Sequence, residues 1–128
     1  METPDHEALN GLKVVLDKLV YHQDEDLSAS APHAFIYFLT IQNLSDRAVT
    51  LLGRKWIIAT EDGKTEIIEG DKIVGKTPSL GPGETFSYNS YHTTNSTAVA
   101  SGAFHGIDAL DQPIWVAIPP FEMKIPGR

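Results

Sequence analysis

The stretch GDKIVGKT, residues 70–77, has the residue types and spacing of a phosphate-binding loop. It fits the pattern G-x-x-x-x-G-K-[ST], in which main-chain N–H groups and a lysine hold the phosphates of a nucleotide. That chemistry also needs a helix directly after the loop, because the helix N-terminus binds part of the negative charge. Thr77 instead precedes Pro78, which disfavours the helical conformation at Thr77. We therefore predict that this stretch is not the loop of a nucleotide hydrolase.

A weaker role in anion binding stays open for the same residues. The two glycines permit left-handed backbone conformations, and turns of that kind can point main-chain N–H groups at a small anion. The two lysines add positive charge. The candidate site for an anion, nucleotide or pyrophosphate consists of Gly70, Lys72, Gly75, Lys76 and Thr77. The alternative is a turn that needs glycine for its backbone alone.

Composition and charge exclude several classes of function. The chain of 128 residues fits one domain, and 17 acidic residues against 10 Lys and Arg give a net charge of −7. Such a surface disfavours general nucleic-acid binding, which depends on cations that neutralise phosphates. There is no cysteine, which excludes thiolate chemistry. The N-terminus is too acidic for a signal peptide, and no apolar run approaches the ~20 residues that span a bilayer. We expect a cytoplasmic protein that does not enter membranes.

Other chemistry finds little support in the sequence. The histidines do not occur at metal-binding spacing, and the acidic run at residues 22–26 is typical of a solvated loop. No calcium loop and no G-x-S-x-G nucleophile elbow is present. We therefore expect no metal, no cofactor and no catalytic residues, and predict that the protein is not an enzyme.

Alternating apolar residues predict β-strands throughout. The clearest strand, residues 34–43, places one apolar set on one face and Ile36 and Phe38 on the other. If that second face is external, the two side chains invite a protein partner; alternatively, a loop or the N-terminal strand covers them. Further runs at residues 49–60, 65–70, 85–92, 97–108, 114–118 and 121–125 also predict strands. The period of residues 12–21 fits either a strand or a short helix.

The spacing of these runs predicts the fold. Asp62-Gly63 lies between two runs and is a strong hairpin signal. Seven to eight short strands at intervals near ten residues indicate an all-β, immunoglobulin/fibronectin type III-like antiparallel β-sandwich. We predict a flexible N-terminal tail at residues 1–10 and a single domain at residues 11–128. Trp56 is expected in the core, and Arg54, on the same strand face, must bend outward or find a carboxylate.

Several segments in order identify the chain as resembling the ApaG family, also called the DUF525 domain. They are FIYFLTIQN, VTLLGRKWII, EGDKIVGKTPSLGPGETFSY, SGAF and IPPFEMKIP. The resemblance implies the sandwich fold, makes residues 12–21 a strand, and implies no catalytic residues. The family has been linked to cobalt and magnesium tolerance, and its domain serves as an interaction module in some eukaryotic proteins. One departure stands out: the family's G-x-G-x-x-G glycines fall on Gly70, Lys72 and Gly75.

The sequence and the resemblance together favour a non-enzymatic interaction module. Its partner is expected to be another protein, bound through a sheet face or loops, and a weak homodimer is also considered. The alternative is the small-anion site at residues 70–77.

Overall fold

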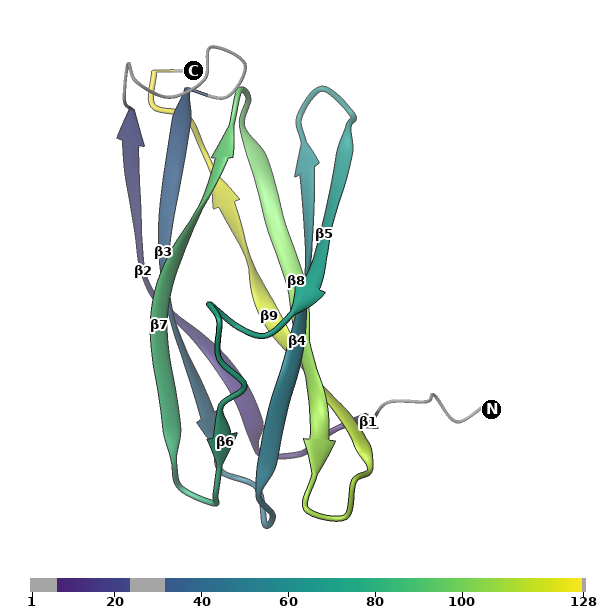
Figure 1. Ribbon diagram of the computed structural model, residues 1–128. Coiled ribbons are helices and arrows are strands. Elements are labelled where there is room, and N and C mark those ends of the chain that lie inside the picture. Colours follow the sequence, from purple (N-terminus) through teal and green to yellow (C-terminus); the bar gives the residue numbers. More distant parts are fainter. Residues whose placement is uncertain (1–6, 24–31, 128) are drawn as a thin grey trace.

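Strands make up all the regular secondary structure of the described residues, 7–23 and 32–127 of the computed structural model (Figure 1). Seven strands have 7 to 12 residues and two have only 2. They are β1 (Glu7–Ala8), β2 (Leu12–Gln23), β3 (His33–Asn43), β4 (Val49–Thr60), β5 (Thr65–Asp71), β6 (Ser79–Leu80), β7 (Thr85–Thr94), β8 (Ala98–Asp108) and β9 (Pro113–Met123). The predicted all-β fold is confirmed.

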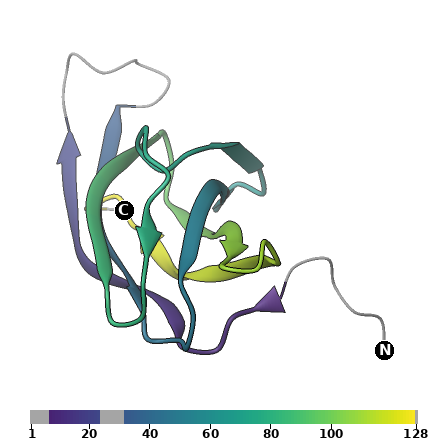
Figure 2. The same cartoon turned by 60° about the horizontal axis from the view of Figure 1, so that its bottom comes forward.

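The strands form two sheets. One has the order β1-β9-β8-β4-β5, with β6 also paired to β4, and the other has the order β2-β3-β7. Every pairing is antiparallel except that of β1 with β9. Figure 2 shows the sheets as two layers, with β6 between β7 and β4. Within the described part of the chain, β5 and β7 therefore lie at the edges of their sheets.

The core lies between the sheets, as the alternation in β3 predicts. Phe35, Tyr37, Leu39 and Ile41 are buried, whereas the intervening side chains of β3 are half-buried on the outer face. Trp56 of β4 packs across the core on Tyr37, with ring centroids 4.9 Å apart. The predicted burial of Trp56 is confirmed.

The end of β3 carries a fully buried amide, that of Asn43. Its Nδ2 donates to the carbonyl oxygens of Arg47 at 2.9 Å and Leu80 at 2.8 Å. Its Oδ1 accepts from the main-chain N–H and the hydroxyl group of Ser45. The main-chain N–H of Asn43 donates to Glu84 O at 3.0 Å. One side chain thus joins β3, the turn after it and β6.

One predicted pair of strands is in fact a single strand. The runs at residues 114–118 and 121–125 were expected to be separated by Pro119-Pro120, but β9 passes through both prolines. The register between β8 and β9 shifts between Ala100 and Gly102, opposite the prolines. Proline has no N–H to donate to a sheet, and it is tolerated where such an irregularity interrupts the pairing.

Two predicted segments lie partly outside the described residues. The tail predicted at residues 1–10 is described only from residue 7, and Glu7 and Ala8 pair with Ile114 and Trp115 of β9. The acidic run at residues 22–26 is described only through Gln23, the last residue of β2.

A buried histidine interrupts the apolar core. His92 of β7 lies with its ring centroid 4.6 Å from that of Trp56 and 4.9 Å from that of Tyr37. Its Nε2 has no hydrogen-bond partner among the described residues. Burial lowers the pKa of His92 to about 4, so the ring is neutral at physiological pH.

This histidine predicts a pH-dependent stability. In the unfolded chain its pKa returns to 6.5. As the pH falls through 6.5, the unfolded state binds a proton that the folded state binds only near pH 4, so the folded state loses stability. Between pH 7 and pH 5 the natural protein should lose about 2 kcal/mol of stability through this histidine. We expect the His92→Phe protein to lack that loss when both are measured by chemical denaturation at the two pH values. An equal loss of stability between pH 7 and pH 5 in both proteins would show that His92 is not the group responsible.

The buried amide predicts a second change in stability. Asn43→Asp keeps the shape but sets a carboxylate oxygen against the carbonyl oxygens of Arg47 and Leu80, so we expect the free energy of unfolding to fall by about 3 kcal/mol or more. The control Ser45→Ala removes one partner only and should cost about 1–2 kcal/mol. Denaturation curves measure both, and an Asn43→Asp protein as stable as the control would refute the bridging role.

Candidate functional site

The loop at residues 70–77 connects β5 to β6 by a tight turn. Ile73 and Lys76 exchange main-chain hydrogen bonds of 2.7 and 3.1 Å. Between them, Val74 and Gly75 have positive φ angles of 50° and 78°, the pair of left-handed residues found in a type I′ turn. Ile73 is fully buried and anchors the turn to the core. Ser79 begins β6, so the helix that a nucleotide-hydrolase loop needs does not follow Thr77, as Pro78 predicted.

Several main-chain N–H groups of the turn already donate hydrogen bonds within the protein. Lys72 N donates to Leu52 O at 2.7 Å, and the N–H groups of Ile73 and Lys76 are bound within the turn. The side chains of Lys72, Lys76 and Thr77 belong to exposed residues. The five predicted anion-site residues therefore lie along one turn, but much of its main chain already serves the fold.

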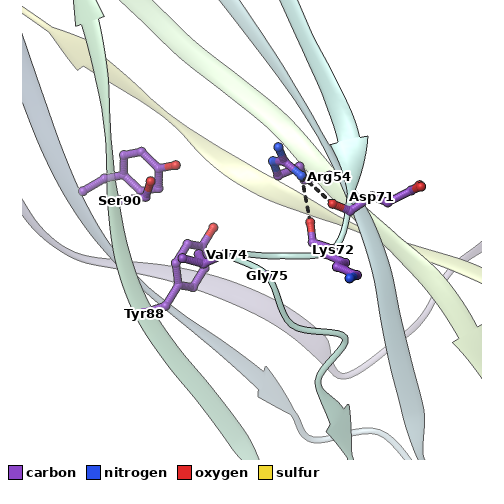
Figure 3. A pocket seen from close by; sticks show the side chains of 8 residues that line it. Arg54, Asp71, Lys72, Val74, Gly75, Tyr88 and Ser90 are labelled. Carbon is purple, nitrogen blue, oxygen red and sulfur yellow. Dashed lines mark hydrogen bonds between the residues drawn. The ribbon is translucent and has the colours of Figure 1, made fainter.

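Arg54 of β4 holds the start of this turn. Its Nη1 donates to Asp71 O at 2.8 Å and to Lys72 O at 2.9 Å (Figure 3). A Cβ atom at Gly70 would lie 2.8 Å from Nη1, so a side chain there would displace the guanidinium from its present position. The sequence suggested that Arg54 needs a carboxylate or an outward bend, and it instead binds two main-chain carbonyl oxygens.

A cavity of about 230 Å³ opens between Arg54, the turn and β7. Figure 3 shows Tyr88 and Ser90 on the β7 strand, across from Arg54, with Val74 and Gly75 on the near side. The lining residues are Tyr37, Arg54, Asp71, Lys72, Val74, Gly75, Tyr88 and Ser90. Because β4 and β5 belong to one sheet and β7 to the other, the cavity lies between the two sheets.

Three hydroxyl groups interact inside this cavity. The hydroxyl of Tyr37 forms hydrogen bonds with the side chains of Ser90 and Tyr88. Burial raises the pKa of Tyr37 and, more strongly, that of Tyr88. Both phenols therefore stay protonated and can donate hydrogen bonds at physiological pH.

The predicted partner-binding residues lie elsewhere, on the outer face of the β2-β3-β7 sheet. Ile36 is aligned with Val20 of β2 and Tyr91 of β7, and Tyr91 is 61% exposed. Phe38 lies next along β3, and the Lys18 ammonium is 5.8 Å from its ring centroid. Both predicted residues are half-buried and belong to one row of side chains. Both side chains lie on the face turned away from the core, and their role in binding a partner stays a prediction.

Only weak signals in the sequence pointed to the cavity. Tyr37 belongs to the apolar face of its strand and Tyr88 alternates with polar residues, so both fit ordinary strand positions, and Ser90 carries no motif. Arg54 was noticed through its shared face with Trp56, but its distant partners at residues 71 and 72 were not predictable from spacing.

The described residues contain neither a cluster of metal ligands nor a membrane-spanning helix. No group of three or more His, Asp or Glu side chains there is arranged to hold a metal ion. None of these residues belongs to a helix long and apolar enough to cross a membrane.

Comparisons with known proteins assign the chain to one family. The family model for the ApaG domain, DUF525, matches residues 23–107. Protein ApaG of Deinococcus radiodurans is 39% identical over 92 residues, 71% of this chain and 72% of that protein. Protein ApaG of Shewanella frigidimarina is 32% identical over 117 residues, 91% of this chain and 92% of that protein. A Northeast Structural Genomics Consortium target solved by X-ray crystallography superposes with a TM-score of 0.82 at 28% identity, covering 92% of this chain and 89% of that one.

The backbone of Lys72 predicts a stabilising substitution. Lys72 has a φ of 69°, which is unfavourable for a residue with a Cβ, and it stands at the middle position of the G-x-G-x-x-G pattern. We expect Lys72→Gly to raise the free energy of unfolding by about 0.5–1 kcal/mol, as measured by denaturation. Lys72→Ala removes the same charge but keeps the Cβ, so an equal gain from alanine would point to charge instead of backbone strain.

Proposed function

Since the chain belongs to the ApaG domain family, we propose that it is a non-enzymatic binding module of the cytoplasm whose partner is another protein. The observation that carries the proposal is the outer face of the β2-β3-β7 sheet. Across its three strands, Val20, Ile36 and Tyr91 form an apolar row, and Phe38 extends it along β3. Clustered apolar side chains at a surface are typical of protein interfaces.

The charges around this row favour an acidic partner surface. Lys18 lies over Phe38, and Lys13 is on the same face opposite Gln42. The acidic side chain beside them, Asp17, accepts a hydrogen bond from the Thr40 hydroxyl. Two lysines against one aspartate give the described part of this face a small positive charge, within a chain whose net charge is −7. We infer a partner with an apolar centre and an acidic rim, since complementary charge steers association.

Two copies of this acidic chain would repel each other. The proposal therefore disfavours a tight homodimer and allows only weak self-association. A role in cobalt or magnesium tolerance, which the resemblance implies, would in this proposal act through the protein partner.

The second candidate function is binding of a small anion, nucleotide or pyrophosphate at residues 70–77. The observation in its favour is the pair of exposed lysines, Lys72 and Lys76, at the two ends of one turn. It ranks second because three N–H groups of that turn are already bound within the protein.

The outer face predicts where a partner will be found. A photo-reactive phenylalanine analogue at position 38 is expected to cross-link one protein in cells, whereas the same analogue at Val99, 43% exposed on β8, is not. We expect Phe38→Asp to weaken binding of that purified protein by at least tenfold in calorimetry, because it puts a charge into the apolar centre. Val99→Asp is the matched control.

Two results would contradict the proposal. One is equal cross-linking from both positions, and the other is unchanged affinity after Phe38→Asp in a protein whose thermal unfolding shows it to be folded. Sedimentation of the natural protein alone separates self-association from binding to a different partner.

A further inference from the structure

The guanidinium of Arg54 has hydrogen-bonding capacity that the fold does not use. Of its five N–H donors, two on Nη1 bind the carbonyl oxygens of Asp71 and Lys72. No carboxylate among the described residues lies in an ion pair with Arg54. The two carbonyl bonds fix the plane of the guanidinium, and Gly70 leaves room beside it. Arg54 is therefore a positioned cation at the wall of the cavity, with donors remaining.

The hydroxyl groups opposite supply another donor. Tyr37, Tyr88 and Ser90 together have three O–H protons, and the hydrogen bonds that Tyr37 forms with the other two use two of them. One proton remains for a ligand. Tyr37 is only 4% exposed, so this group is held by packing and does not have to be ordered when a ligand binds.

The charge balance around the cavity fits a ligand with one negative charge. Asp71 and Lys72 are neighbours at the rim and bring opposite charges, and Figure 3 shows the Asp71 side chain extending away from Tyr88 and Ser90. Arg54 is left as the uncompensated charge. A polyphosphate would bring several negative charges to a protein that already carries −7.

The size and the lining of the cavity further restrict the class of ligand. Its volume of about 230 Å³ is too small for a nucleotide to be enclosed, but suffices for a small acid. The rings of Tyr37 and Tyr88 and the side chain of Val74 provide apolar surface. A planar carboxylate matches the planar donors of Arg54.

We propose that this cavity binds a monoanionic carboxylate attached to an apolar or aromatic group, with Arg54 and the one remaining hydroxyl proton of the Tyr37, Tyr88 and Ser90 group holding the carboxylate. The site does not depend on the outer face of the β2-β3-β7 sheet, nor on the N–H groups of the turn at residues 70–77. The carboxylate belongs either to a small acid or to the C-terminus of a peptide, since both present the same group.

Titration of the natural protein with defined probes tests the proposal. Phenylacetate and a short peptide ending in phenylalanine are followed by amide shifts in ¹⁵N-labelled protein, beside phenylacetamide, the amidated peptide and pyrophosphate. We expect saturating shifts at residues 54, 71, 72, 88 and 90 with at least one of the two carboxylates, and none with its neutral counterpart. Shifts with the peptide alone, or with phenylacetate alone, identify the source of the carboxylate.

Matched variants then assign the donors. Tyr88→Phe keeps the ring and removes the hydroxyl, and we expect about tenfold weaker binding of the active probe, as we do for Ser90→Ala. Lys76→Ala should leave that affinity unchanged, because Lys76 does not line the cavity. The idea is overturned if neither carboxylate binds at millimolar concentration, if the neutral counterparts bind equally well, or if Lys76→Ala weakens binding while Tyr88→Phe does not.

Discussion

The buried amide of Asn43 is the interaction on which much of this sandwich depends. An unsatisfied amide in the core would cost more than the hydrogen bonds gain, so its partners must all be in place together. Those partners belong to the turn after β3 and to β6, which are far apart in the sequence. Ile73 lies only seven positions before Leu80, whose carbonyl oxygen accepts from Asn43. Fixing β6 therefore fixes one end of the turn that borders the cavity, and the burial of Ile73 fixes the other.

The glycines of the turn have separate physical reasons. Gly70 gives the Arg54 guanidinium room to approach the backbone, and Gly75 is favoured because its φ is 78°. In a nucleotide hydrolase the same letters serve a loop that wraps around phosphates. Here their spacing follows from an arginine on the neighbouring strand and from a two-residue turn. A sequence pattern constrains the backbone, whereas the chemistry depends on the elements on either side of it.

The sequence predicted the features that are encoded locally. The alternation in residues 34–43 predicted which side of β3 is buried, Asp62-Gly63 predicted the β4–β5 hairpin, and Pro78 excluded a helix after Thr77. The continuity of β9 through Pro119-Pro120 was missed, because it depends on an irregularity in its pairing with β8.

The cavity was missed for a similar reason, since its walls come from strands that are distant in the sequence. Ile73 and its exposed neighbour Val74 stand among glycines and lysines, so no periodicity marked Ile73 as buried. The carbonyl oxygens that Arg54 binds carry no side-chain signature at all. Such positions become predictable only when the sheet order is known.

The edge strand β5 has a consequence for the behaviour of the protein in concentrated solution. It pairs only with β4 in the described part of the chain, so its other side offers main-chain groups that another strand could join. Glu66, Glu69 and Asp71 lie along this short edge, and all three are exposed. Two copies that met edge to edge would bring these carboxylates together. The exposed carboxylates of β5 thus oppose edge-to-edge association into filaments, although this edge of the larger sheet is unpaired.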